Sequence, residues 1–164
     1  KAGVMVRNTG AKKQVAQSIK VQQMLTKVGT NPTALNTAEM DKQGLRKNIK
    51  GFDPTNVSVK QMGNLSAMLR SRGLISEITS FTLMNAGDKF DRFGIPKNPD
   101  EPFNALEYFA MKLDDIQNNN IKGNKYANYL VPEYKKAIYV LQSLQNYGKG
   151  NGTTVTDKNV SAKA

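Results

Sequence analysis

The chain of 164 residues contains neither histidine nor cysteine, so no disulfide or ordinary zinc site can hold its fold together. Stability must come from an apolar core, and 38% apolar residues suffice for a modest core in one compact domain. The same absence excludes Ser-His and Cys-His nucleophile pairs, ordinary haem and iron–sulfur ligation, and a histidine pH switch. What remains is mostly carboxylate, lysine and hydroxyl chemistry, so the sequence predicts no catalytic residue, no metal and no cofactor.

Positive charge is concentrated at the start of the chain. Residues 1–37 contain no acid and six basic residues: Lys1, Arg7, Lys12, Lys13, Lys20 and Lys27. Residues 100–120 contain only one lysine and five acids: Asp100, Glu101, Glu107, Asp114 and Asp115. With a net charge of +11, such a field would steer the protein towards nucleic acid, anionic lipid or an acidic partner, or would only keep it soluble.

Apolar spacing close to the helical period runs through much of the chain, and no strand pattern, P-loop, dinucleotide fingerprint or internal repeat occurs. We therefore predict an all-α fold of five or six short helices in an irregular orthogonal bundle. The predicted organisation is a flexible basic leader over residues 1–10, a helical domain over 11–148 and a polar, disordered tail over 149–164. No apolar run approaches the roughly 20 residues that span a bilayer. The compartment stays open between the cytoplasm and an exported or virion-associated location.

Two helices are predicted in the first third of the chain. The first covers residues 11–28, ends at Gly29 and fits either a packed or a partner-binding helix. Its apolar residues are Val15, Ile19, Met24, Leu25 and Val28. The second runs from the cap residue Asn36 to Lys50, with Gly44 inside it at a cost of about 1 kcal/mol relative to alanine.

The clearest local pattern lies between residues 57 and 73. Ser58 and Gln61 form a capping box, and Val57 and Met62 stand where a hydrophobic staple requires apolar residues. A helix therefore begins after Ser58. Gly73, followed by an apolar residue, ends it in the manner of a left-handed glycine cap.

Ser76 then caps a second helix, so the sequence predicts two helices joined by a short corner. A DNA-binding helix-turn-helix is disfavoured because residues 76–86 contain no Lys or Arg, and a packing hairpin is favoured instead. The apolar and hydroxyl residues along the second helix are Ile78, Phe81, Thr82 and Met84. The residues Leu65, Leu69, Gly73-Leu74-Ile75-Ser76 and Phe81 resemble the corner of short bacterial SHOCT-type helical hairpins, without the acidic pair usual after the turn. This resemblance implies a bacterial interaction hairpin and is too short to assign the chain to a family.

Residues 88–102 form an irregular, proline-containing stretch that is too long for a tight turn. It must be pinned to the domain or serve as a binding loop. Its aromatic pair, Phe90 and Phe93, is expected to fill the core; the alternative is an exposed anchor for a partner. Asp88 and Asp91 lack the acid spacing of a calcium-binding loop, so no calcium site is predicted.

A strong helix is predicted over residues 101–118, with Asp100 as its N-cap and Pro102 in its first turn. The predicted buried stripe is Leu106, Phe109, Ala110, Leu113 and Ile116. Asp114 and Asp115 are adjacent, so they point about 100° apart and cannot face each other as a hydrolytic carboxylate pair. We expect a solvated acidic face, which would also be able to dock the basic first helix.

The last helix, or pair of helices, is predicted over residues 126–147, with Pro132 in a first turn and Gly148 as the end. Its buried stripe is Ala137, Ile138, Leu141 and Leu144. The tyrosines 126, 129, 134 and 139 lie among lysines here. This mixture suits the edge of a core, a protein-binding patch or a single-strand nucleic-acid surface, where rings stack on bases and lysines contact phosphates.

The leading functional prediction is a non-enzymatic helical protein-protein interaction or assembly component of a bacterial appendage, a secretion system or a phage virion. The alternative is a basic nucleic-acid-associated protein that binds DNA or RNA without sequence specificity. An enzyme with carboxylate or Ser-Lys chemistry would need an open polar cleft. The candidate partner-binding residues are Lys12, Lys13, Lys20, Lys27, Phe90 and Phe93. The candidate nucleic-acid-binding residues are Lys122, Lys125, Tyr126, Tyr129, Lys135 and Lys136.

Overall fold

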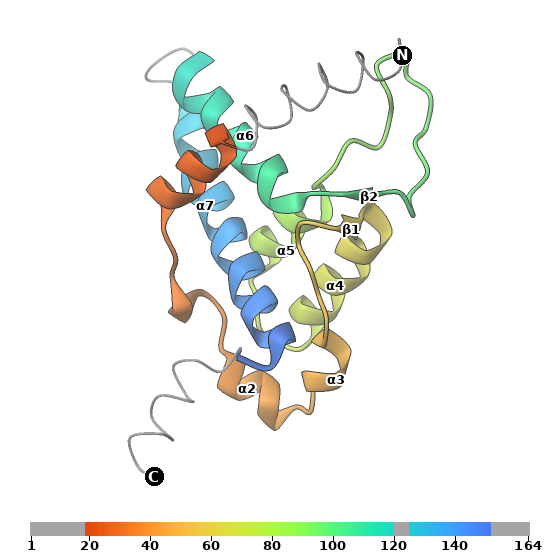
Figure 1. Ribbon diagram of the computed structural model, residues 1–164, viewed down its shortest axis with the longest axis vertical. Helices are drawn as coiled ribbons and strands as arrows, with labels where there is room; N and C mark the ends of the chain where they lie inside the picture. The colour runs from red at the N-terminus through yellow and green to blue at the C-terminus, as the bar shows by residue number, and fades with distance from the viewer. Residues whose placement is uncertain (1–18, 120–124, 152–164) are drawn as a thin grey trace, which may run out of the picture.

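The computed structural model describes residues 19–119 and 125–151, which form an all-α fold around one long helix (Figure 1). Residues 19–28 are helical. The elements that follow are η1 (Pro32–Ala34), α2 (Thr37–Lys42), α3 (Arg46–Ile49), β1 (Val57–Ser58), α4 (Val59–Ser71), α5 (Glu77–Met84), β2 (Pro102–Phe103), α6 (Ala105–Asn119), α7 (Lys125–Asn146) and η2 (Tyr147–Asn151). The predicted fold class is confirmed. Within the described ranges, no helix has the length and apolar character needed to cross a membrane.

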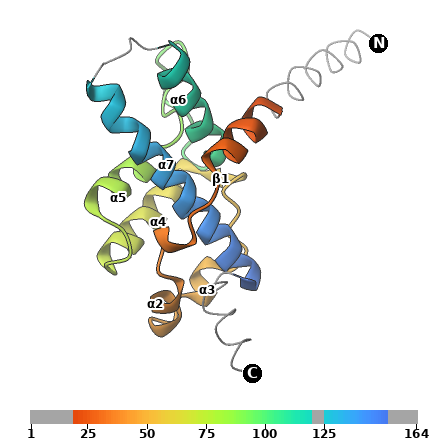
Figure 2. The same cartoon turned by 90° about the vertical axis from the view of Figure 1, so that its left-hand side faces the viewer.

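The long helix α7 lies in the middle of the molecule, against α5, α6 and η1 (Figures 1 and 2). Its predicted stripe is fully buried: Ala137, Ile138, Leu141 and Leu144. The predicted stripe of α6 is buried as well, at Leu106, Phe109, Ala110 and Leu113, while Ile116 is half-buried. Each large apolar side chain contributes about 1.5–3 kcal/mol on full burial, so the contact of α6 with α7 is a major part of the core, beside that of α4 with α5.

The predicted helix caps between residues 57 and 76 are all present. The Ser58 hydroxyl accepts the Gln61 N–H at 3.0 Å, and the Gln61 side chain accepts the Ser58 N–H at 2.9 Å. Gly73 has a φ of +74°, and the Leu74 N–H donates to the Leu69 carbonyl at 2.9 Å. The two bonds between Ser58 and Gln61 fix the start of α4, and the left-handed Gly73 with the Leu74 bond fixes its end.

The helix α5 turns its small hydroxyl residues and Leu83 inward and its other large apolar residues outward. Thr79 and Ser80 are buried, and the Ser80 hydroxyl donates to the Ser66 carbonyl of α4 at 3.2 Å. Small hydroxyl side chains let the two helices approach closely while their polar atoms stay paired. The outward side chains are Ile78, Phe81 and Met84, which are 49%, 68% and 36% exposed.

Two helix boundaries differ from the prediction because of the local backbone. Gly44 has a φ of +70°, which ends one helix there, so the predicted second helix is two short ones, α2 and α3. Asn104, rather than Asp100, caps α6: its side-chain oxygen accepts the Glu107 N–H at 2.9 Å. Pro102 does not start the helix because it belongs to β2, which pairs antiparallel with β1. These two-residue strands also correct the expectation that the chain has no strand pairing.

The last helix is continuous through Pro132, which was predicted to lie in a first turn. In fact α7 runs for 22 residues from Lys125, with Pro132 in its interior. A proline cannot donate to the carbonyl four residues earlier, which here is that of Asn128. Both Pro132 and Asn128 are exposed, so water can reach the carbonyl that the proline leaves without a partner.

Candidate functional site

Residues 88–102, here called the arm, extend away from the helices as the green excursion on the right of Figure 1. Every residue of the arm is exposed. Its outer part closes on itself as a hairpin: the Asp91 N–H donates to the Ile95 carbonyl at 2.8 Å, and the Lys97 N–H donates to the Lys89 carbonyl at 2.9 Å. The arm is therefore a structured projection rather than a covered loop.

The turn of the hairpin is fixed by one carboxylate. The Oδ1 atom of Asp91 accepts the N–H groups of Phe93 at 2.8 Å and Ile95 at 2.9 Å. Gly94, with a φ of +79°, takes the left-handed conformation that the turn requires. Asp91 therefore satisfies the backbone of the turn, and this role accounts for it without a metal.

The hairpin presents three large apolar side chains to solvent, here called the tip residues: Phe90 is 59% exposed, Phe93 73% and Ile95 58%. The guanidinium carbon of Arg92 lies 4.9 Å from the centroid of the Phe93 ring. The expectation that the two phenylalanines fill the core is wrong. The hairpin satisfies its own backbone away from the body, and the core is already filled by α6 and α7. Their exposed placement corresponds to the alternative of an aromatic anchor.

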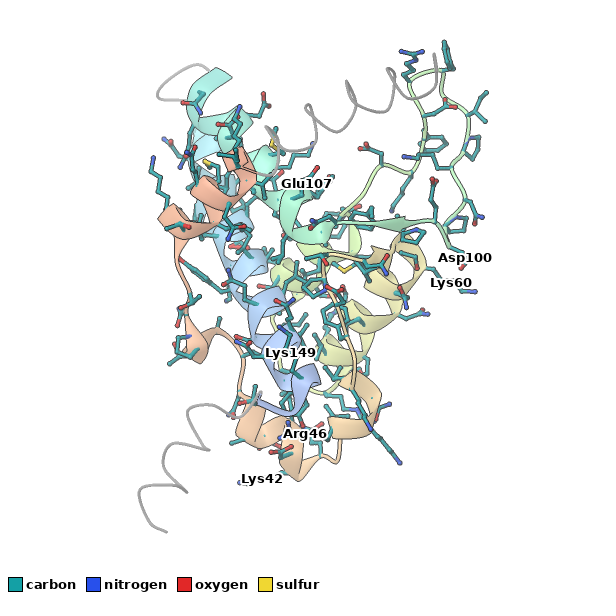
Figure 3. All side chains as sticks on the ribbon, viewed as in Figure 1. Lys42, Arg46, Lys60, Asp100, Glu107 and Lys149 are labelled. Carbon is teal, nitrogen blue, oxygen red and sulfur yellow. The ribbon has the colours of Figure 1, made fainter. Side chains whose placement is uncertain are left out.

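The foot of the arm is tied to the body by backbone bonds. The Lys60 N–H donates to the Pro99 carbonyl at 3.1 Å, and Figure 3 shows Lys60 and Asp100 at this junction. At the other end of the arm, Gly87 is buried. A Cβ there would lie 2.9 Å from a methyl group of Val59, so only glycine fits without a shift. The projection thus starts from a fixed base.

A hollow of about 410 Å³, here called the foot hollow, opens beside the base of the arm along α6. Its apolar lining comes from Phe103, Tyr108 and Met111. Its charged lining is Asp88, Glu107, Asp115, Lys97 and Lys112. Glu107 is labelled on α6 in Figure 3. The foot hollow therefore combines an apolar surface with three carboxylates and two amines.

Tyr108 connects the foot hollow to the core. Its ring packs edge-on against Phe109, with 5.2 Å between centroids, and its hydroxyl donates to the Asn85 carbonyl at 3.4 Å. Burial raises the pKa of Tyr108 above its usual value of 10, and nearby Tyr134 and Asp88 raise the pKa further. The phenol is therefore protonated at neutral pH and stays a hydrogen-bond donor.

The predicted cationic partner residues lie elsewhere. Lys20 forms an ion pair with Asp114 at 2.8 Å, and Lys27 is exposed on the same helix, across the molecule from the arm in Figure 1. Lys12 and Lys13 lie outside the described residues. Asp114 is buried, which corrects the expectation of a fully solvated acidic face and confirms the alternative that it docks the first helix. The bond from Lys20, followed by that from Asn118, lowers the pKa of Asp114, although burial opposes this shift.

The predicted nucleic-acid surface is only partly described. On α7, Tyr129 is 48% exposed, Lys136 is exposed and Lys135 is half-buried. Two other tyrosines of this stretch agree with the prediction that it forms the edge of a core. Tyr134 packs on α6, and the Tyr139 hydroxyl donates to the Val28 carbonyl at 3.0 Å. Lys122 and the side chains of Lys125 and Tyr126 lie outside the described residues.

The foot hollow is also an open polar cleft, which an enzyme would need. Four of its five charged side chains are exposed and Glu107 is half-buried, so water competes with proton transfer among most of them. Among residues 19–119 and 125–151, no group of three Asp or Glu side chains is placed to hold a metal ion. Comparison of the chain with protein-family models, with curated proteins and with solved structures finds no match.

Proposed function

We propose that this protein is a non-enzymatic interaction or assembly component whose main contact element is the arm. The observation that carries this proposal is the exposure of Phe90, Phe93 and Ile95 together on a structured projection. Scattered exposed apolar residues are normal on protein surfaces, but three large ones on one turn are typical of an interaction site. Aromatic residues and arginine are also the types that carry most binding energy at protein interfaces.

Pre-organisation supports the same function. The Asp91 carboxylate and the hairpin bonds hold the tip residues in place before any partner arrives. A partner therefore does not have to order this segment, and more of the contact energy is available as affinity. A bacterial appendage, a secretion apparatus or a phage virion would suit such a component, in keeping with a chain free of cysteine and tryptophan and with the resemblance of its helical hairpin.

A photo-crosslinking residue in place of Phe93 tests this function in cells that naturally contain the protein. Phe81 on α5 is the matched control, because it is 68% exposed against 73% for Phe93 and lies away from the arm. We expect a discrete protein adduct from position 93 and none of equal yield from position 81. If neither position produces an adduct, the proposed function is wrong; if position 81 alone does, the contact element is α5 instead.

The alternative of nucleic-acid association rests on the net charge of +11. In the described part of the Tyr/Lys stretch, Tyr129 and Lys136 are exposed, but Tyr134 and Tyr139 are used inside the protein. We therefore place this alternative second. The salt dependence of DNA binding provides a direct test of this alternative.

A further inference from the structure

We infer that the arm of one copy docks into the foot hollow of a second copy, and that two copies exchange arms reciprocally. This inference rests on the proposed function and specifies the partner. It starts from the observation that one chain carries both a projecting apolar tip and, at the base of the same projection, a recess with complementary chemistry. A surface that contains both halves of a contact can pair with itself about a two-fold axis, because residue i then meets j while j meets i.

The apolar parts match. The tip residues include two aromatic rings that the protein itself leaves mostly uncovered. The foot hollow has an aromatic and thioether lining from Phe103, Tyr108 and Met111, and its volume of about 410 Å³ lies within the range of sites that enclose small groups. Rings pack edge-on against rings, and methionine adapts its shape to them.

The charges match as well. Near the tip the balance is basic, because Lys89 and Arg92 outnumber Asp91, whose carboxylate accepts the backbone N–H groups of the turn. Around the foot the balance is acidic: Asp88, Asp100, Glu101, Glu107 and Asp115 outnumber Lys60, Lys97 and Lys112. Placing the tip of one copy at the foot of the other therefore brings opposite charges together twice in each pair of molecules.

Geometry favours exchange between copies over closure within one. The tip residues are exposed, so the arm does not fold back onto its own foot hollow. Two arms lying side by side in opposite directions would put each tip at the other base. The net charge of +11 opposes association at long range. At about 0.15 M salt, however, the screening length is about 8 Å, so the charges at the contact determine whether two copies attract each other.

The test is the mass of the full chain in solution, measured by sedimentation velocity at about 0.15 M salt over a range of micromolar concentrations. We expect a concentration-dependent dimer. The double variant Phe90→Ser/Phe93→Ser should weaken dimerisation by about 100-fold or more, because each ring loses most of its burial. Phe81→Ser is the matched control and should leave the dimer unchanged. All three positions are exposed in the single copy, so these variants should fold.

The foot is tested by Met111→Lys, which places a charge in the foot hollow, and by Asp88→Lys on its exposed rim. Circular dichroism checks that each variant is folded. If Met111→Lys does not fold, Asp88→Lys still tests the foot hollow. Both should weaken dimerisation. A monomer at every concentration, a dimer that both folded foot variants leave intact, or a dimer lost only in Phe81→Ser would overturn the inference. An adduct of another protein at position 93, together with a monomeric chain, would reject the second copy as partner and leave the proposed function standing.

Discussion

At the scale of single residues, a cluster of polar contacts surrounds Tyr147. Its buried hydroxyl donates to Asp41 at 2.6 Å, and Arg46 bonds both that carboxylate and the Tyr147 carbonyl, with its guanidinium 4.0 Å from the tyrosine ring. Burial, followed by the bond to Asp41, raises the pKa of Tyr147 to about 12. The cluster joins η2, which directly follows α7, to α2 and α3, although residue 147 and residue 41 are far apart in the chain.

Tyr147→Phe should lower the free energy of unfolding at pH 7 by about 1.5–3 kcal/mol, the value of a hydrogen bond to a charged group. Because the folded pKa lies above the unfolded value of 10, the tyrosine contribution is complete below pH 10 and is lost as the pH rises towards 12. Urea unfolding of both proteins at pH 7 and above pH 10 measures this. The difference between them should shrink at high pH, and a constant difference would show that the hydroxyl is not responsible.

Residue identity alone did not reveal which apolar side chains are buried. Phe109 is fully buried and Phe93 is 73% exposed, although both are phenylalanines. Likewise Ile19, in the predicted stripe of the first helix, is 54% exposed, and the buried residue there is Val21. Burial of one side chain depends on what occupies the space beside it, which its own sequence neighbourhood does not state.

At the scale of elements, two glycines in helical conformation serve opposite purposes. Gly148 lies against α3: a Cβ would be 2.6 Å from the Ile49 carbonyl oxygen, and its own carbonyl accepts the Gly51 N–H at 3.0 Å. Gly63, inside α4, has no atom within 4 Å of where its Cβ would be. The first glycine lets η2 meet α3, whereas the second only lowers helix stability.

Gly148→Ala should therefore lower the free energy of unfolding by about 1–3 kcal/mol, as overpacking against backbone does. Gly63→Ala should raise it by about 0.5–1 kcal/mol, since alanine is the better helix former. Thermal or urea unfolding of the two variants beside the parent checks both signs. If the two substitutions shift stability in the same direction, the close contact of η2 with α3 is not the cause.

Short sequence patterns predicted the ends of helices correctly where a nearby side chain or a glycine caps the helix directly. Ser58 with Gln61, and Gly73, are such cases. The start of α6 was misplaced because Asp100 and Asn104 are both acceptable caps, and the choice was made by the pairing of β2 with β1, a contact distant in sequence. The course of α7 through Pro132 was likewise decided by packing over its full length, which outweighs one lost hydrogen bond.

At the scale of the whole molecule, the net charge of +11 predicts weak, sequence-independent binding to DNA. We expect binding to mixed-sequence single- and double-stranded DNA at about 50 mM salt and an affinity at least tenfold lower at about 200 mM, because released counterions drive it. Fluorescence anisotropy with labelled oligonucleotides measures this. Strong binding at the lower salt with this steep loss would favour the nucleic-acid alternative over the proposed assembly role, and no binding even at the lower salt would remove that alternative.

The sequence by itself determined the all-α class, the buried stripes of α6 and α7, the caps of the α4–α5 hairpin and the absence of histidine and cysteine chemistry. These follow from helical periodicity and from bonds that close within a few residues. Only the tertiary structure decided that Lys20 pairs with Asp114, that α5 turns Phe81 outward and that the arm projects with its aromatic tip uncovered. Those features depend on which segments compete for the same space, and such competition involves contacts between residues far apart in the chain.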